Sequence, residues 1–502
     1  MYDARLDLGY VLQILRDEET RICATLALVR RKLNELSPIS QLPTEILEEV
    51  FNICVSWIYD SRKPKHRLAW TQVCSSWRRI SLGSSRLWQR IDLCDAPFAD
   101  KFLVRSRKAP LIIVSASPLQ ATTINLAAHA NRLRTIDVFL YSDVMRNFFT
   151  SIGANLSALA SLSLKVPSFS PTVYLPFSVP HLRRLSLDGV AMPWEDFQNL
   201  THLSLRSISP ELCPSISQVH DICSRSPNLE HIRIEGLIPS CHEITSSSKL
   251  PVTLLDLKEF IISGEQQVIS TLLSGLILGP FARLRLFTSL TDNLHSLFPQ
   301  GSPWIENCRS DSADTIRLSR NGAHVSINGA RAWSEEPSQT LFSLSSAVSV
   351  RTCVTSSLNH LFVLSNITKL ELNSGMLSDI SIESLQILLT NLMNLETLCV
   401  AFNELDDLLS ILRDTQPTSG RCYAPRLKNL SFSKPADLWF HFKDRWLTAV
   451  IDLARFRQNH SLPIHAIEFL RCHGITQNST EDLQTVVGQI IIAEKMGMKS
   501  RF

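Results

Sequence analysis

The stretches Leu-Arg-Arg-Leu-Ser-Leu at residues 182–187 and Leu-Thr-His-Leu-Ser-Leu at residues 200–205 share one pattern. An apolar residue is followed three and five positions later by two more, and these two alternate with a polar residue, as in a short strand with one buried face. The pattern recurs at Leu133/Ile136/Val138, Leu159/Leu162/Leu164, Leu229/Ile232/Ile234, Leu257/Phe260/Ile262, Phe281/Leu284/Leu286, Ile367/Leu370/Leu372, Leu395/Leu398/Val400, Leu427/Leu430/Phe432 and Ile464/Ile467/Phe469. These residues predict a series of short strands.

The spacing of the strands predicts how they are connected. Many of them begin roughly 23 to 30 residues apart, which is a leucine-rich-repeat period. Stretches with helical spacing lie between them, for example residues 378–392. We therefore predict an α/β solenoid in which strand, turn and helix or loop form a unit that stacks on the next unit. The alternative is an all-α array of leucine-rich helical pairs that contains such triplets by chance.

The segment of residues 287–366 interrupts this series. Within it, Asn321-Gly322 is flanked by alternating apolar and polar residues, which is a strong signal for a β-hairpin. We expect either an irregular repeat or an excursion from the array. Such excursions often carry binding contacts, and a hairpin without a binding role is the alternative.

Residues 6–36 predict a long amphipathic helix. Its apolar stripe consists of Leu8, Leu12, Leu15, Ile22, Leu26, Val29, Leu33 and Leu36. These positions follow each other in steps of three and four, as in heptads, once Glu19 is included as the one polar break. One interpretation is that the stripe packs onto a neighbouring domain of the same chain. The other is a short coiled coil that makes a homodimer.

Composition and charge restrict the classes of partner. A hydrophobic content of 44% and a charged content of 19% fit a folded chain. A net charge of +3 over 502 residues gives no reason to expect nucleic acid or an acidic membrane as a partner. The longest apolar stretch, residues 268–282, is too short to span a bilayer.

Motifs for chemistry are missing from the sequence. The 12 cysteines are spread singly, without the Cys-x-x-Cys pairs of zinc ribbons or thioredoxins. No phosphate loop, dinucleotide fingerprint, nucleophile elbow or His-Glu-x-x-His motif is present. We therefore expect no catalytic residue, no metal and no cofactor. Scattered thiols without a signal-peptide pattern favour a reducing compartment, the cytoplasm or the nucleus.

Aromatic residues gather near the C-terminus at Trp439, Phe440, Phe442, Trp446 and Phe456. The spacing of Trp439, Phe442 and Trp446 puts these three on one face of a helix. We expect this helix to pack on the end of the array. The alternative is an exposed aromatic anchor for a partner.

Residues 38–93 carry an ordered set of apolar residues of a different kind. A helix is predicted over residues 44–57, after Leu42-Pro43, and a third helix through Leu68, Val73, Trp77 and Ile80. Leu-Pro-x-Glu at 42–45, Val-Phe at 50–51, Val-Cys-x-x-Trp-Arg at 73–78 and Leu-Trp at 87–88 resemble the F-box. The order of segments is similar to the large fungal F-box families with a divergent leucine-rich array. The basic loop at 61–67 is longer than usual for the family.

The resemblance implies that this module docks on the Skp-type adaptor of a cullin–RING ubiquitin ligase. The residues that it assigns to adaptor binding are Leu42, Pro43, Glu45, Ile46, Leu47, Val50, Phe51, Val73, Cys74 and Trp77. Three short helices cannot bury so much apolar surface by themselves, and a hydrophobic groove of a partner is a common way to cover it. The alternative is that these residues only hold the module to the array.

The predicted domains are an N-terminal helix at residues 1–37, an F-box at 38–93 and a repeat domain at 94–502. The implied function is that of a non-catalytic substrate receptor in an SCF-type ligase, with an unknown protein substrate on the repeat domain. The alternative is a scaffold without a ligase role that associates through residues 6–36. Arg183, Arg184 and Arg206, beside predicted strands, leave open whether a phosphate is recognised.

Overall fold

The computed structural model describes residues 3–58, 64–115, 117–122, 124–153, 156–237, 250–279, 282–288, 297–298, 304–305, 313–321, 324–330, 340–346, 358, 361–373, 380–401, 405–417, 419–433, 442–472, 475, 480–493 and 500–501. The chain divides into two compact units, Met1–His181 and Leu182–Phe502. This division falls inside the predicted repeat domain, and the predicted boundaries at residues 37/38 and 93/94 stay predictions. Among the described helices, none combines the length and apolar character that crossing a bilayer requires.

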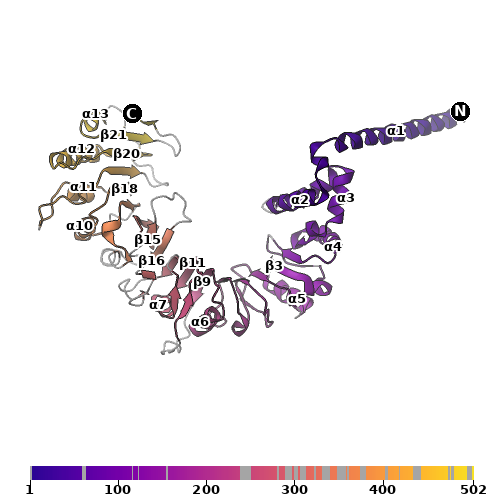
Figure 1. The fold of residues 1–502 in the computed structure, drawn as a ribbon, viewed down its shortest axis with the longest axis horizontal. Coiled ribbons are helices and arrows are strands. Elements are labelled where there is room, and N and C mark those ends of the chain that lie inside the picture. The colour runs from indigo at the N-terminus through magenta and orange to yellow at the C-terminus, as the bar shows by residue number, and fades with distance from the viewer. Residues whose placement is uncertain are drawn as a thin grey trace. The chain divides into compact units, whose positions relative to one another are not determined.

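The first unit begins with helices and continues into short parallel strands (Figure 1). Its elements are α1 (Asp3–Glu35), η1 (Pro38–Gln41), α2 (Thr44–Ile58), η2 (Pro64–Gln72), α3 (Ser75–Gly83), η3 (Ser85–Trp88), β1 (Arg90–Asp92), η4 (Leu93–Asp95), α4 (Ala96–Arg105), β2 (Leu111–Val114), η5 (Ala127–Arg132), β3 (Leu133–Phe139), α5 (Ser142–Ile152), β4 (Ser161–Lys165) and β5 (Val173–Tyr174). Strands β1 to β4 pair in chain order. The register places Ile91, Ile113, Ile136 and Leu162 in one buried row.

The helices of this unit confirm two predictions and correct a third. The helices predicted at 6–36 and 44–57 are α1 and α2. The third predicted helix is wrong in its first half, because residues 64–72 form the 3-10 helix η2 and α3 begins only at Ser75. Cys74 has extended backbone geometry, and its Sγ accepts the Trp77 N–H at 3.5 Å. Cys74 therefore caps α3 and separates it from Val73.

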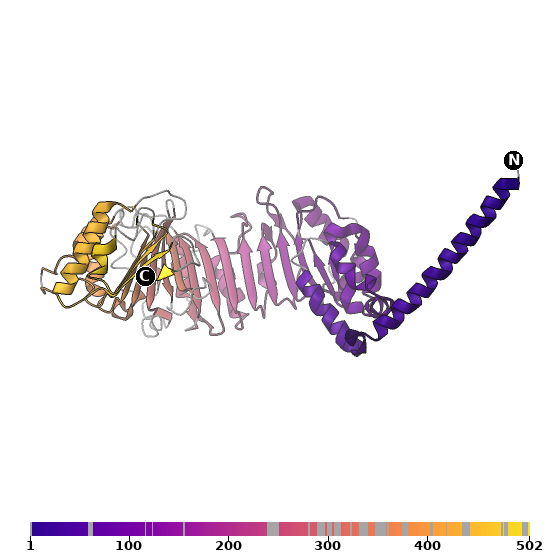
Figure 2. The ribbon, with the colours of Figure 1, turned by 90° about the horizontal axis from the view of Figure 1, so that it is seen from above.

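The second unit is built from parallel strands with helices on one side (Figures 1 and 2). Its elements are β6 (Arg184–Asp188), β7 (Val190–Ala191), η6 (Trp194–Asp196), β8 (His202–Arg206), α6 (Ile216–Ser224), β9 (His231–Leu237), β10 (Val252–Leu254), β11 (Glu259–Gly264), α7 (Gln266–Ser274), β12 (Leu276–Leu278), β13 (Arg283–Thr288), β14 (Thr315–Asn321), β15 (His324–Ala330), β16 (Thr340–Ser346), η9 (Leu364–Asn366), β17 (Lys369–Leu372), α10 (Ile382–Asn391), β18 (Thr397–Ala401), α11 (Asp406–Leu412), β19 (Asn429–Ser433), α12 (Asp444–Asn459), β20 (Ala466–Leu470), α13 (Glu481–Gln484), β21 (Gln489–Ala493) and β22 (Ser500–Arg501).

The predicted apolar triplets are the core of these strands. Strands β6, β8, β9, β11 and β13 pair in parallel, and β17 to β21 do the same. One row of the register consists of Leu185, Leu203, Ile232, Phe260 and Leu284, each no more than 1% exposed. The leucine-rich-repeat-like α/β fold is therefore confirmed, and the all-α alternative is wrong.

The predicted hairpin belongs to the sheet and is not an excursion from it. Strands β14 and β15 are antiparallel, and β15 is also antiparallel to β16. β16 pairs in parallel with β13, whereas β14 pairs in parallel with β17. The three strands therefore fill the gap between β13 and β17 in reverse chain order. Ala313 just before β14, and Ile316 and Leu318 within it, repeat the apolar triplet, a match that the sequence analysis missed.

The C-terminal aromatic residues pack inside the second unit. Helix α12 begins at Asp444, so Phe442 precedes the helix and does not share a helical face with Trp446. Both side chains are nevertheless buried and in edge-to-face contact at 5.8 Å. The packing interpretation is confirmed for these two residues. Trp439 and Phe440 lie outside the described residues.

A buried arginine ties α12 to the turn that precedes β19. The side chain of Arg457 is fully buried and donates Nη hydrogen bonds to the carbonyls of Tyr423 and Ala424 at 3.1 and 3.0 Å. Burial lowers the pKa of Arg457. These donors satisfy carbonyls that water cannot reach, so their loss is costly.

We predict that Arg457→Met lowers the free energy of unfolding by about 2–4 kcal/mol, since it leaves buried carbonyls without donors while keeping most of the volume. Denaturant unfolding followed by circular dichroism measures this change. Arg455→Met, at an exposed position of the same helix, is the control and should change stability by less than about 0.5 kcal/mol. Equal effects of the two substitutions would contradict this role of Arg457.

Candidate functional site

One face of α2 builds the core of the helical module at residues 39–94. Leu47, Phe51 and Val55 recur every four residues, and their side chains are 3%, 2% and 9% exposed. The Phe51 ring lies 4.8 Å from the ring of Trp77 and 6.5 Å from that of Trp70. These contacts join α2 to η2 and α3.

A second anchor closes the end of the module. Trp88 is 1% exposed, and its Nε1–H donates to the carbonyl of Ser81 at 2.8 Å. Its ring makes an edge contact with Phe102 of α4 at 5.0 Å. The Leu-Trp pair that closes the predicted F-box thus fastens α3 to the next helix.

The other face of α2 carries apolar side chains that are about half exposed. Ile46 and Ile53, seven residues apart on α2, are 50% and 45% exposed. Leu42 before the helix and Val73 after η2 are also exposed. Exposed apolar side chains that share one helix face mark interaction sites more often than scattered ones do. We call Ile46 and Ile53 on α2, together with the exposed Leu42 and Val73 of the same module, the docking face, and take it as the candidate functional site.

Burial divides the residues that the sequence assigned to adaptor binding. Leu47 and Phe51 are buried; Val50, Cys74 and Trp77 are half-buried; Leu42, Pro43, Glu45, Ile46 and Val73 are exposed. Leu47 and Phe51 face the module's own core, so their packing accounts for their apolar character. Adaptor binding by the set remains a prediction, and in the isolated chain its exposed members are the ones open to a partner.

The sequence analysis missed one member of the docking face. Ile53 lies seven residues after Ile46, with the half-buried Val50 between them. This spacing of four and three residues puts all three on one side of a helix. The spacing was visible in the sequence. It did not single out Ile53, because the buried stripe of Leu47 and Phe51 has the same period.

We predict that Phe51→Ala lowers the free energy of unfolding by about 3–5 kcal/mol, because it removes a buried ring between two tryptophans. Ile46→Ala on the same helix should cost less than about 1 kcal/mol, because the side chain is half exposed. Thermal and denaturant unfolding of both variants measure the difference. A loss of stability from Ile46→Ala as large as that from Phe51→Ala would show that the docking face is part of the core.

The polar positions of the second unit's strands form a network of charges. Arg206 on β8 contacts Glu235 on β9 at 3.0 Å, and Arg233 contacts the same carboxylate at 2.6 Å. Burial raises the pKa of Glu235, but hydrogen bonds from Arg233 and Arg206 outweigh this effect and hold the pKa below its usual range. Arg206, which the sequence left open for phosphate recognition, is thus engaged by carboxylates, whereas Arg183 and Arg184 are exposed.

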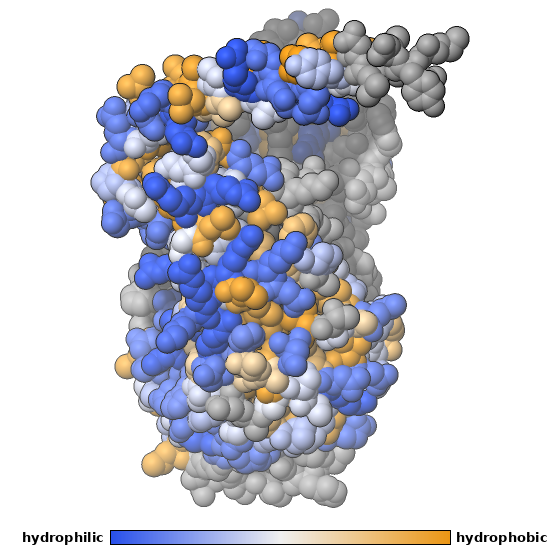
Figure 3. Space-filling model, turned by 90° about the vertical axis from the view of Figure 1, so that its right-hand side faces the viewer, coloured by the Kyte–Doolittle hydropathy of each residue, from blue (hydrophilic) through white to orange (hydrophobic). Residues whose placement is uncertain are grey.

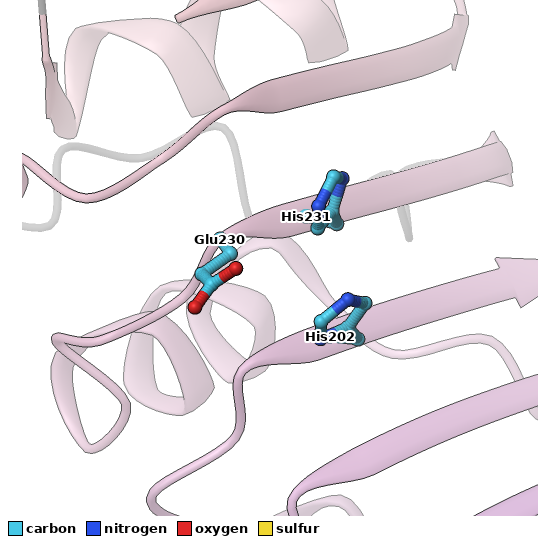
Figure 4. A group of neighbouring side chains, drawn as sticks. All are labelled: His202, Glu230 and His231. Atoms are coloured by element: carbon cyan, nitrogen blue, oxygen red, sulfur yellow. The ribbon is translucent and has the colours of Figure 1, made fainter.

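Two histidines stack at the edge of this network (Figure 4). His202 of β8 and His231 of β9 are register partners, and their ring centroids are 4.6 Å apart at an interplanar angle of 29°. Glu230 precedes β9, and one ligand atom from each of the three residues lies within 4.8 Å of the others. Among the described residues, this is the group of His, Cys and carboxylate side chains close enough to be examined as a metal site.

The geometry of this group favours an ion network over a metal site. Zinc binds imidazole nitrogens at about 2.0–2.1 Å along the ring plane. Two nearly parallel rings aim their nitrogens side by side and do not converge on one ion at that distance. Glu230 is also held by Lys258 at 2.6 Å, and Glu259 lies 3.8 Å from the other histidine, His231.

We predict that His202 makes the second unit less stable at mildly acidic pH. Burial lowers the pKa of His202, and His231 and Arg184 lower it further, while Glu230 opposes this. The unfolded chain then binds a proton at this histidine more readily than the folded chain does. The free energy of unfolding is therefore greatest above the ordinary pKa of about 6.5 and falls as the pH drops below it.

Unfolding of the wild type and His202→Asn at pH 7.5 and pH 5.5 tests this prediction. The variant should lose less stability between the two values. His465→Asn, at an exposed histidine directly before β20, is the control substitution. An unchanged pH dependence in His202→Asn would refute the assignment.

Comparison with known proteins agrees with the helical module. The F-box-like family model matches residues 39–94. No curated protein sequence matches the chain. Three solved structures share low similarity with it. They are the leucine-rich repeat-containing protein LegL7 from Legionella pneumophila (TM-score 0.23, 10% identity, 76% of this chain and 92% of that one), the Rad7 and Elc1 complex in yeast (0.27, 11%, 92% and 94%) and the TLR13-ssRNA13 complex (0.21, 12%, 80% and 41%).

The family match and the strands describe two different parts of the chain. The chain carries an F-box-like domain at residues 39–94, and parallel strands of leucine-rich-repeat type follow it. An F-box-like domain suggests binding of a Skp-type adaptor. F-box proteins with such repeats are typically adaptors without catalytic residues of their own.

Proposed function

We propose that this chain is a substrate receptor of an SCF-type cullin–RING ubiquitin ligase. In this proposal the docking face of the F-box-like domain binds a Skp-type adaptor, and the strand face of the repeat domain binds a protein substrate. The chain contributes proximity and no catalytic residue, since holding a substrate beside a charged ubiquitin-conjugating enzyme raises its effective concentration.

The observation that carries the proposal is the apolar docking face within the F-box-like match. Leu42, Ile46, Ile53 and Val73 are 39–58% exposed, although the inner face of the same helix is fully packed. A short amphipathic helix with a second apolar stripe is suited to a hydrophobic groove on another protein. The packed inner face holds the stripe in a defined position, which limits the ordering that binding requires.

The repeat domain supports the receptor half of the proposal. Ion pairs join charged side chains on β8 and β9 and on β11 and β13, and they leave the carboxylates and guanidinium groups partly exposed. Such a surface suits a large polar protein partner and gives specificity through charge complementarity. The nine cysteines in the described residues are free thiols, which is consistent with the cytoplasm or nucleus, where such ligases would act.

We predict that Ile46→Asp weakens binding of a purified Skp-type adaptor at least about 30-fold, because a charge would enter an apolar groove. Isothermal titration calorimetry with the full chain measures the affinity. Val104→Asp, at an apolar residue of α4 that is 78% exposed and lies outside the F-box-like match, is the matched control and should bind like the wild type.

Two results would count against the proposal. If the wild type does not bind the adaptor, the docking face has another role. If it binds, but a reconstituted adaptor–cullin–RING assembly ubiquitylates no protein captured by residues 182–502 within the full chain, the scaffold alternative is favoured.

A further inference from the structure

The long helix α1 leaves its whole apolar stripe uncovered. The eight stripe residues from Leu8 to Leu36 are each 45–76% exposed. Figure 2 shows α1 as a long single helix, and hydrophobic residues reach its surface at the top of the view in Figure 3. Within the described part of the first unit, the stripe is therefore not packed against the helices that follow α1.

The size of the stripe argues for a helical partner of similar length. From Leu8 to Leu36 it extends about 42 Å, and at a helix diameter of about 10 Å it covers on the order of 400 Å². This is the size of the largest apolar patch on a typical soluble monomer, and such patches are often functional. The steps of three and four keep the stripe on one side over four heptads, which is the pattern that packs against another helix with the same repeat.

The polar residue in the stripe disfavours two parallel copies. In a parallel pair each stripe residue faces its own counterpart, so Glu19 would face Glu19 of the second copy in the apolar seam. Like charges at such a position are destabilising. The residues that flank the seam do not compensate for this repulsion, because in a parallel pair Glu18 would face the uncharged Cys23 of the second copy.

An antiparallel alignment removes this conflict and pairs the charges. When Leu26 lies beside Ile22 of the second copy, Leu12 meets Leu36 and Leu33 meets Leu15. Glu18 then faces Lys32 of the second copy on one edge. Both side chains are exposed, and each contacts an oppositely charged residue of its own helix three positions away.

The other edge of the same alignment gives Glu19 its partners. Glu19 meets Val29 of the second copy in the seam, and Arg16 faces Arg30 of the second copy beside it. Glu19 follows Arg16 by three residues on the same helix, so its carboxylate is placed to attract both guanidinium groups. This attraction offsets the repulsion between the two arginines.

We infer that the chain forms a homodimer through α1, in which the two helices run antiparallel with Leu26 of one copy beside Ile22 of the other. This inference goes beyond the receptor function and does not depend on adaptor binding. Because each α1 leads into an F-box-like domain, the antiparallel arrangement puts the two domains at opposite ends of the coiled coil.

Sedimentation equilibrium of the full chain over a wide range of concentrations tests the dimer. Leu26→Glu should weaken dimerisation at least about tenfold, because it puts a charge in the seam. Ala27→Glu introduces the same residue one position outside the stripe and should leave the dimer unchanged. Glu19→Leu should strengthen the dimer at least about tenfold, an effect that loss of folding cannot imitate.

The relative orientation of the two α1 helices can be measured separately at Cys23, an exposed free thiol. In the antiparallel alignment Cys23 faces Cys23 of the second copy on one edge, whereas in a parallel pair the two lie on opposite edges. A short bifunctional thiol reagent should therefore link two chains. Cys23→Ser should abolish the link, which separates it from reaction at other exposed thiols such as Cys94.

Three results would overturn the inference. A wild type that sediments as a monomer at every concentration would leave the stripe to a helix of another protein. A dimer that tolerates Leu26→Glu would form through another surface. A dimer that Leu26→Glu disrupts, but that Cys23 does not crosslink, would refute the antiparallel alignment.

Discussion

The rows of apolar side chains between parallel strands are the constraint on which the second unit depends. Leu185, Leu203, Ile232, Phe260 and Leu284 stack in register, each almost fully buried. A single strand with its connecting helix or loop cannot bury its apolar face, and only its neighbours on both sides complete the core. Stability therefore accumulates along the array, and the other face of every strand is free to vary.

That freedom explains where the polar residues of the second unit lie. Because alternate residues of a strand point to opposite faces, the register that stacks the leucines also aligns His202 with His231 and both with Glu259. Arg206, Arg233 and Glu235 come together in the same way on neighbouring strands. The charge network is thus a consequence of the apolar register, and its composition is where a partner's specificity would be encoded.

The F-box-like domain uses one helix for two purposes. The stripe of Leu47 and Phe51 is buried in the module, where Phe51 packs on two tryptophans, whereas the stripe of Ile46 and Ile53 stays about half exposed. Helix α1 presents a third apolar stripe in the same unit. The first unit therefore carries two separate apolar surfaces, each available to a protein partner.

Local periodicity was enough to predict the elements themselves. The triplets around Leu185 and Leu398, the heptads from Leu8 to Leu36 and the hairpin at Asn321 each depend on residues close together in the chain, so their signals are complete within the sequence. The placement of the cap at Cys74 was not predicted, since η2 and α3 together imitate one helix in apolar spacing.

Only the tertiary structure decided which apolar residues remain exposed and how distant strands are ordered. Leu47 and Ile46 are adjacent and equally apolar, and the side that is buried depends on where Trp70 and Trp77 pack. The reversed order of β14, β15 and β16 between β13 and β17 depends on pairings between segments far apart in the chain. A sequence records what each residue prefers locally, whereas burial and strand order arise from contacts between distant residues that compete for the same surface.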